Sequence, residues 1–332
     1  MADLPGRWEL LAPPGSGWPG LQRVHLRQRG WPGLHSHLWE QSVVAAAASS
    51  GARVLNIAGS GPWFGGPQVS WLHDAAVFDH PEAYRASFVL WYRALFRQRA
   101  RRGDLLVTPS AHARARLAHH LGVAESRIAV LPHGGDHLDA VAPEPAVLGR
   151  LGLERSRFWL CIASHNPNKN LPRLLRAHAR GRAGRWPLVL VGDTHDRVFA
   201  NAGLKPGEAD IVALPQASDA ELKALLQAAR ALVMPSLSEG FGLPALEAMR
   251  LGCAVLAARA GALPELCGEA AHFVDPLSDD DIASALDTLA RDDVRIDELR
   301  RAGLQQSAPL TWARAARSLL DLLAQPTPGA GA

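Results

Sequence analysis

The sequence predicts an α/β protein built on parallel sheets, and three observations lead to this fold class. From about residue 50 onwards, short apolar runs of strand length alternate with stretches of helical periodicity. The runs are apolar throughout, which is typical of strands covered by helices on both faces of a parallel sheet. With 332 residues, of which 48% are hydrophobic and 20% charged, the chain can bury the cores of two domains. We therefore expect a globular protein rather than a disordered one.

The expected strands form two series along the chain. The first series covers residues 54–58, 69–73, 105–109 and 128–132, with a helix over 110–121 before its last member. The second series covers residues 158–163, 188–192, 211–214, 231–236 and 254–257. Helices are expected to begin at Ser218, which forms a capping-box pattern with Glu221, and at Ser278, which precedes the acidic turn 279–281. We interpret that turn as a helix start rather than a metal site.

The boundary between the two series is expected near residue 145. Residues 139–153 contain Pro143, Glu144 and Pro145 and have the composition of a linker. The sequence therefore predicts an N-terminal domain over 1–145 and a C-terminal domain over 146–324. Residues 325–332 are rich in Pro, Gly and Ala, so we expect a disordered tail there.

Charge and cysteine content narrow the function classes. The 35 Lys+Arg residues against 32 Asp+Glu residues give a net charge of +3, a weak basis for nucleic-acid binding, so we expect no nucleic-acid partner. The 3 cysteines show no paired spacing, which excludes a disulfide scaffold and favours the reduced thiols of a cytoplasmic protein. No secretory signal is visible, and the apolar runs are too short to cross a bilayer. The histidines lack zinc-site spacing, so no metal is expected.

One stretch combines a strand, a glycine-rich turn and a helix in immediate succession. The apolar run 231–236 leads to Glu239, Gly240 and Gly242, and Pro244 suits the first turn of the helix that carries Glu247. Glycines let backbone N–H groups approach a ligand closely, and a helix N-terminus attracts phosphate. Carboxylates accept hydrogen bonds from sugar or ribose hydroxyls. At the carboxyl end of a parallel strand, this pattern predicts a nucleotide site.

This stretch resembles the signature of the retaining glycosyltransferases of family 4, also called group 1, whose hallmark is a pair of glutamates separated by seven residues. Further matches follow in the family's order over roughly residues 35–324: His73-Asp74, 107–110, 131–136, 166–170, 231–249 and 263–265. The resemblance implies the GT-B architecture of two facing Rossmann-like domains. Residues 7–13 resemble that architecture's second strand, so the N-terminal domain is expected to lack its first strand and Gly-rich loop.

The resemblance also implies the roles of the site residues. Lys169 would contact the donor diphosphate, Glu247 would hold the ribose hydroxyls, and His73 would help to position the donor sugar. Glu239 would grip the transferred sugar and the β-phosphate together with the amides of the turn that follows. Base contacts are expected from the backbone near Gln216. The expected donor-binding set is therefore Gly240, Phe241, Gly242, Leu243, Glu247 and Gln216, with His73, Lys169 and Glu239 as the catalytic set.

The chemistry of the reaction supports the role of Lys169 independently. Cleaving a sugar from a nucleoside diphosphate builds negative charge on the leaving oxygen, which a fixed cation and a helix N-terminus stabilise without a metal. Many relatives carry an Arg six residues before this Lys, where this chain has Ala163. The family retains anomeric configuration by front-face displacement, so Glu239 is assigned to sugar positioning. A double displacement with two close carboxyls stays open, because sequence spacing does not fix that geometry.

Residues 134–137 resemble the corresponding segment of mannosyl- and rhamnosyl-type enzymes that use GDP donors. We therefore expect the enzyme to transfer a hexose, mannose-like in kind, from a GDP- or UDP-linked donor, with no other cofactor. Its acceptor would be a polysaccharide or lipid-linked glycan, as in lipopolysaccharide assembly. The basic, aromatic segment 84–102 would rest on an anionic membrane, or else form a domain-covering helix whose arginines face solvent. The alternatives are a catalytically silent nucleotide-sugar-binding or scaffold subunit, and an epimerase or phosphorylase of the same architecture.

Overall fold

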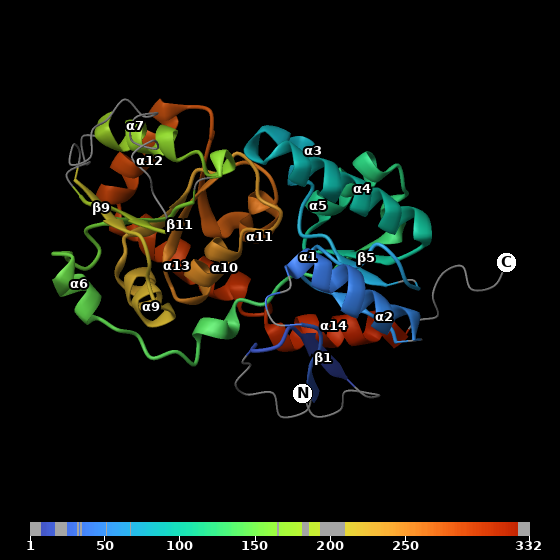
Figure 1. Ribbon diagram of the computed structural model, residues 1–332. Coiled ribbons are helices and arrows are strands. Elements are labelled where there is room, and N and C mark those ends of the chain that lie inside the picture. Colours follow the sequence, from blue (N-terminus) through green and yellow to red (C-terminus); the bar gives the residue numbers. More distant parts are fainter. Residues whose placement is uncertain are drawn as a thin grey trace. The chain divides into compact units, whose positions relative to one another are not determined.

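The computed structural model describes residues 8–16, 25–31, 33, 35–50, 52–66, 68–164, 166–180, 186–192 and 210–324. These residues form two compact units (Figure 1). Of the described residues, the first unit holds those within 8–109, 114–131 and 316–324, and the second holds those within 110–113 and 132–315. The units therefore differ from the domain ranges expected from the sequence, because residues 132–145 belong to the second unit and 316–324 to the first. The expected tail at 325–332 lies outside the described residues.

The first unit is built on a parallel sheet in which the strands follow one another in chain order. Its strands are β3 (Leu55–Asn56), β4 (Val69–Trp71), β5 (Leu105–Thr108) and β6 (Ile128–Val130). One face is covered by α3 (Ala76–Asp79), α4 (Ala86–Arg102) and α5 (Ala111–Leu121), and the other by the later turns of α14 (Trp312–Ala324). All four strands lie within the expected runs, and the helix expected over 110–121 is confirmed.

The N-terminal part of the first unit adds a small separate sheet and a helical segment. Strand β1 (Glu9–Ala12) pairs in parallel with β2 (His25–Gln28), and β1 lies within the strand expected over 7–13. A continuous helical stretch follows, made of α1 (Ser36–Trp39), a π-helical turn (Glu40–Val44) and α2 (Ala45–Ser49).

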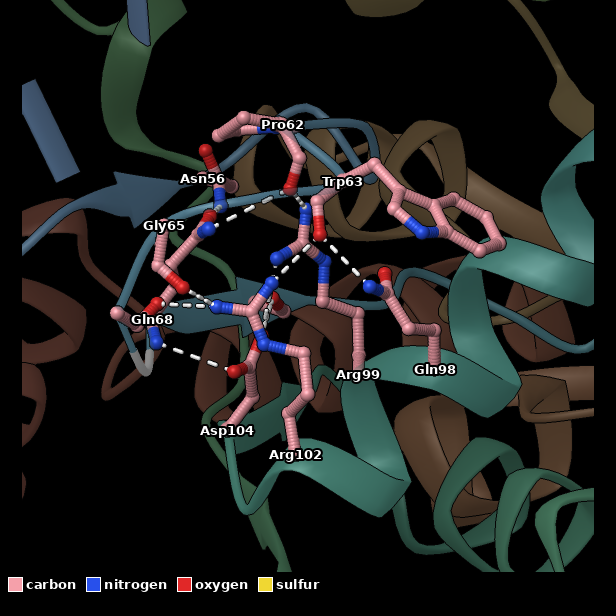
Figure 2. A network of polar contacts seen from close by, with 12 residues as sticks. Asn56, Pro62, Trp63, Gly65, Gln68, Gln98, Arg99, Arg102 and Asp104 are labelled. Atoms are coloured by element: carbon pink, nitrogen blue, oxygen red, sulfur yellow. Dashed lines mark hydrogen bonds and ion pairs between the residues drawn. The ribbon is translucent and has the colours of Figure 1, made fainter. Parts of the chain in front are cut away.

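A polar network from α4 fixes the loop between β3 and β4 (Figure 2). Arg102 Nη1 donates to the Trp63 carbonyl at 2.6 Å, and Arg99 donates to the carbonyl of Pro62. Arg99 is only 1% exposed, and its charge is matched by Asp104 Oδ2 at 3.3 Å. Because Arg99 is buried and Arg102 is bound to the loop, the expectation that the arginines of this helix face solvent is wrong for these two residues.

The second unit contains a fully parallel sheet of six strands within the described residues, in the order β12-β11-β10-β7-β8-β9. The strands are β7 (Trp159–Ile162), β8 (Leu188–Val191), β9 (Ile211–Leu214), β10 (Ala231–Met234), β11 (Ala254–Ala258) and β12 (Ala271–Val274). From β7, strands β8 and β9 follow toward one edge of the sheet, and from β10, strands β11 and β12 follow toward the other edge. The order therefore reverses between β7 and β10, which is the switch point of a doubly wound dinucleotide-binding fold.

Helices cover both faces of this sheet and create two cores (Figure 1). One face packs against α9 (Asp219–Ala228) and α10 (Leu243–Arg250), and the other against α7 (Leu171–Arg180) and α12 (Asp279–Arg291). The described part of this unit also contains the α-helices α6 (Ala146–Arg150), α11 (Leu263–Cys267) and α13 (Asp293–Ser307). The capping box of Ser218 with Glu221 and the N-cap at Ser278 are both present, as expected.

The segment expected to be a linker is instead a packed part of the second unit. Lys223, which is 8% exposed, donates to the carbonyls of Leu138, Asp139 and Val141 at 2.9, 2.9 and 2.8 Å. Helix α6 follows, and its Val147 is fully buried. The prediction of a linker over 139–153 is therefore wrong, because one buried ammonium group and short apolar contacts fix a segment whose composition is typical of a loop.

Candidate functional site

The loops after β7 and β10 meet at the switch point of the second sheet. Lys169 follows β7, and its Nζ donates to Glu239 Oε1, which follows β10, at 2.7 Å. Ser236 Oγ donates to the same carboxylate oxygen, also at 2.7 Å. The side chains of Lys169 and Glu239 are 25% and 13% exposed, so the pair is sheltered but reachable. The structure thus brings together two expected site residues that lie far apart in the sequence.

Two asparagines join these loops and give the ion pair a fixed geometry. The Asn168 carbonyl accepts from the Leu237 N–H at 2.7 Å. Asn170 adopts a left-handed conformation with φ of 54°, and its Nδ2 donates to the carbonyls of Pro235 and Pro276 at 3.0 and 2.8 Å. Asparagine tolerates this conformation better than most residues. The Asn-Pro-Asn-Lys-Asn sequence therefore attaches Lys169 to the loop that carries Glu239.

The backbone of Glu239 is held from the opposite side by the segment after β11. Its carbonyl accepts from the Ala262 N–H at 2.9 Å. A Cβ at Gly261 would lie 2.4 Å from the Glu239 nitrogen, and Gly261 has φ of 60°. Only glycine permits this close approach, so the position of Glu239 depends on contacts on both sides of its loop.

Helix α10 begins directly after the glycine-rich turn. Gly242 is its N-cap with φ of 98°, and Pro244 stands in the first turn. Phe241 is 8% exposed and packs edge-to-face on His133, with ring centroids 5.0 Å apart, so its side chain belongs to the core while its backbone belongs to the turn. The first turn of a helix presents N–H groups and a partial positive charge. The turn of Gly240, Phe241, Gly242 and Leu243 is thus suited to binding a phosphate.

Glu247 lies one turn into α10 and is 7% exposed. Its Oε1 is 3.0 Å from Nε2 of His137, which lies in the short 3-10 turn η4 (Asp136–Leu138). Burial raises the pKa of the Glu247 carboxyl, and the neighbouring His137 acts in the opposite direction. A buried carboxylate with a fixed donor on one oxygen can offer its other lone pairs to a ligand.

The sequence did not identify His137 as a site residue. Its signal lies in the adjacent glycines, because a Cβ at Gly135 would lie 2.6 Å from Leu246 Cγ of α10. A Cβ at Gly134 would lie 2.0 Å from the Trp312 nitrogen. Two glycines directly before an acidic residue and a histidine thus indicate a turn that packs closely on its neighbours.

His73 belongs to the first unit, where it follows β4. Its Nε2 is 2.7 Å from the Ile57 carbonyl. A carbonyl can only accept, so the proton of the neutral ring is on Nε2. Asp74 Oδ1 accepts from the Ala76 N–H at 2.8 Å, at the start of α3. The ring of His73 is therefore oriented by the loop that follows β3.

The remaining expected positions differ in exposure. Gln216 is exposed in the segment after β9, at the same carboxyl edge of the sheet as Lys169 and Glu239.

The free cysteines Cys161, Cys253 and Cys267 are buried, and burial raises the pKa of each thiol to about 12, in accord with the core thiols expected. Within the described ranges, no group of three or more His, Cys, Asp or Glu side chains could hold a metal ion.

Comparison with known families agrees with this geometry. The sequence profile described as "Glycosyl transferases group 1" matches residues 150–306, and that described as "Glycosyltransferase Family 4" matches residues 11–137. This chain belongs to the family 4 glycosyltransferases. The resemblance inferred from the ordered motifs is therefore confirmed.

Curated relatives of this family 4 chain include mannosyltransferases. It is 36% identical over 226 residues to the MMP alpha-(1->4)-mannosyltransferase of Mycolicibacterium hassiacum, covering 64% of this chain and 51% of that protein. It is 29% identical over 255 residues to the O-antigen chain mannosyltransferase B of Escherichia coli, covering 74% of this chain and 66% of that protein. The chain thus spans between half and two thirds of the length of these two relatives.

Solved structures confirm the expected GT-B fold of the family 4 chain. WaaG, a glycosyltransferase involved in lipopolysaccharide biosynthesis, superposes with a TM-score of 0.70 at 16% identity, covering 93% of this chain and 89% of that one. Anabaena HepE in complex with UDP and glucose gives a TM-score of 0.66 at 20% identity, covering 78% and 72%. The fold class predicted from the strand and helix series is therefore correct.

Proposed function

We propose that this chain transfers a hexose, mannose-like in kind, from a nucleoside-diphosphate sugar to a glycan or lipid-linked acceptor with retention of configuration. The observation that carries this proposal is the 2.7 Å pair of Lys169 and Glu239 at the switch point of the second sheet, beside the N-terminus of α10. In doubly wound folds, ligands bind outside the carboxyl ends of the strands at this point.

Each side chain of the site matches one part of a sugar nucleotide. Lys169 would neutralise charge on the leaving diphosphate, and the N–H groups at the start of α10 would bind its β-phosphate. Glu239, held by Lys169 and Ser236, would accept hydrogen bonds from the sugar hydroxyls. Glu247 would accept from the ribose hydroxyls, and the backbone near Gln216 would contact the base. In the first unit, His73 would help to position the sugar.

The transfer itself needs no side-chain nucleophile and no metal under this proposal. In front-face displacement, the departing diphosphate oxygen takes the proton of the acceptor hydroxyl while the acceptor oxygen bonds to the anomeric carbon. Glu239 Oε1 already accepts from a cation and a hydroxyl at 2.7 Å each, so this carboxylate is held as an acceptor. These contacts favour sugar positioning over covalent catalysis by Glu239.

The donor and acceptor are proposed from the relatives. Mannosyltransferases among them favour mannose, and a GDP- or UDP-linked donor follows from the family and from HepE, which was solved with UDP. The O-antigen and lipopolysaccharide proteins among the matches favour a polysaccharide or lipid-linked acceptor. Such an acceptor would place the enzyme in the cytoplasm, at the inner face of the membrane.

A peripheral membrane contact through 84–102 is supported by part of α4. Leu90 is 74% exposed, Phe88 is 39% exposed, and Arg97 and Arg101 are exposed. No described helix has the length and apolar character needed to cross a bilayer. Binding to vesicles with and without anionic lipid tests this contact, and loss of binding in the variant Leu90→Glu/Arg97→Glu is the expected result.

The first test is a thermal-shift panel with UDP, GDP, ADP and TDP on the full chain. A nucleotide at one hundred times its Kd should add about 2.7 kcal/mol to the free energy of unfolding and raise the Tm. The shift should be lost in Glu247→Ala. If a folded chain responds to none of the four, the donor site is wrong.

The second test measures transfer from the donor that the panel identifies, with NMR of the product to assign its anomeric configuration. Lys169→Ala and Glu239→Gln should each lower the rate by about a hundredfold or more. Binding without transfer to any glycan or lipid-linked acceptor would favour a silent sugar-nucleotide-binding subunit instead. Inversion at the anomeric carbon would contradict the front-face mechanism.

A further inference from the structure

The turn that carries His137 is built to bring this side chain onto Glu247. Both residues belong to the second unit, and His137 Nε2 lies 3.0 Å from Glu247 Oε1. Gly135 N–H donates to the Leu310 carbonyl at 3.0 Å, and Asp136 Oδ1 accepts from the Trp312 N–H at 2.7 Å. The turn that carries the histidine is therefore held by the segment 310–312.

Trp312 also determines which ring nitrogen of His137 carries the proton. The indole Nε1–H of Trp312 points at His137 Nδ1 at 3.4 Å, and the two rings lie 6.4 Å apart. An indole N–H can only donate, so Nδ1 must be the acceptor. The neutral imidazole then carries its proton on Nε2, the atom that faces Glu247.

We propose that His137 is a positioning residue of the nucleotide site, which donates from Nε2 to Glu247 Oε1 and so orients this carboxylate toward the ribose hydroxyls. The inference rests on the proposed function, since it assigns the nucleotide's ribose to Glu247. It adds a residue that lies outside the motif of paired glutamates.

The groups around Glu247 act on its carboxyl in opposite directions. Burial disfavours the ionised carboxylate, and Asp219 at the start of α9 acts in the same direction. On η4, Asp136 is engaged with Trp312, and on α10 itself Arg250 is bound to Asp139 at 2.6 Å. His137 is a neighbouring group that opposes protonation of Glu247, through the hydrogen bond that it makes to this carboxyl.

The experiment compares the full chain with His137→Ala, His137→Gln and, as a matched control, His119→Ala, an exposed histidine on α5. Isothermal titration with GDP and with UDP is carried out from pH 5 to pH 8. At pH 7.5 we expect His137→Ala to raise the Kd about tenfold, the effect of one hydrogen bond to a charged group. The glutamine amide can still donate to Glu247, so His137→Gln should stay within about threefold of the parent.

The pH dependence separates positioning from a merely structural role. Ribose hydroxyls donate to the ionised carboxylate, so nucleotide binding should weaken as Glu247 becomes protonated on the acid side. Because His137 lowers the pKa of Glu247, the acid limb should move to higher pH in His137→Ala and less so in His137→Gln. Tm values without nucleotide, measured for all variants, confirm that each is folded.

A second readout needs no nucleotide. Long-range ¹H–¹⁵N spectra of the histidine rings should show His137 as the neutral tautomer with the proton on Nε2, assigned by the signal that His137→Gln lacks. In Trp312→Phe this preference should weaken. A proton on Nδ1 in the parent chain would overturn the inference.

The outcomes also separate this inference from the proposed function. If the parent binds a nucleotide and Glu247→Ala abolishes binding, but His137→Ala binds like the parent at every pH, His137 has no positioning role and the proposed function stands. If the parent binds neither GDP nor UDP, the donor site fails and the inference fails with it.

Discussion

Replacing Lys223 by Met tests whether one ammonium group holds residues 138–141. The methionine keeps an apolar stem of similar length but removes the donor to the carbonyls of Leu138, Asp139 and Val141. A hydrogen bond to a charged group contributes about 1.5–3 kcal/mol when its partner stays dry. Leu138 is 1% exposed, so the hydrogen bond to its carbonyl should contribute its full free energy. Asp139 is exposed and Val141 is half-buried, so water can partly replace the ammonium group at their carbonyls.

The expected loss in the free energy of unfolding is therefore about 2–4 kcal/mol rather than the sum of three buried bonds. For a unit of this size each kcal/mol lowers the Tm by about 2–4 °C, which gives a decrease of about 4–16 °C. Differential scanning calorimetry measures the change, and limited proteolysis within 139–153 shows whether the segment opens first.

Lys169→Met is the matched control. Its pair with Glu239 is 25% and 13% exposed, so its loss should change the free energy of unfolding by less than about 1 kcal/mol while transfer is lost. Lys223→Met should instead lower the Tm, although it removes no group that is assigned to contact the nucleotide. If Lys223→Met melts within about 1 °C of the parent, the three hydrogen bonds do not hold the segment and the reasoning is refuted.

Three further predictions concern the packing at Gly134, the ion pair of Asp279 and the buried cysteines. Gly134→Ala places a Cβ 2.0 Å from the Trp312 nitrogen, so it should lower the Tm and speed hydrogen exchange over 310–315; an unchanged exchange pattern would contradict the packing. Hydrogen bonding from Arg176 lowers the pKa of Asp279, so the stability that Asp279 contributes is complete above the ordinary carboxyl pKa and is lost as the pH falls through the lowered pKa. The greater resistance of the parent to urea relative to Asp279→Asn should therefore be complete at pH 6 and should decrease as the pH is lowered below the ordinary carboxyl range. The thiols of Cys161, Cys253 and Cys267 are buried and have pKa values of about 12. Iodoacetamide should therefore leave the native chain unmodified at pH 8, as judged by mass spectrometry.

Much of the fold could be predicted because buried parallel strands leave unbroken apolar runs. Each expected run contains a strand of the structure, from β3 to β11. Strand β12 was not predicted, since His272 interrupts its apolar pattern and only the last two residues of Ala271–Val274 are strongly apolar and adjacent. Arg99 was placed in solvent for a similar reason, because its burial depends on Asp104 and on loop carbonyls that the helix pattern does not contain.

The site was predictable where its residues share one turn and not where packing joins distant turns. Glu239, Gly242 and Glu247 stand on a single strand–turn–helix unit, whose chemistry is visible in the sequence. Lys169 was identified by its motif, but its 2.7 Å contact with Glu239 depends on strand order, which places β7 beside β10. His137 was not recognised, because its contact with Glu247 requires close packing at Gly135 that no local pattern specifies.

Helix α14 has a consequence for how this chain folds during synthesis. Trp312 at its start packs against the turn at Gly134, and its later residues Leu319, Leu322 and Leu323 cover one face of the first sheet. Strands β3 to β6 are therefore made long before the helix that shields them leaves the ribosome. Domains usually fold in the order of their synthesis, but one apolar face of the first sheet stays uncovered until α14 has been synthesised. A nascent chain arrested before residue 310 should thus be a substrate for chaperones, and its release should complete both units together.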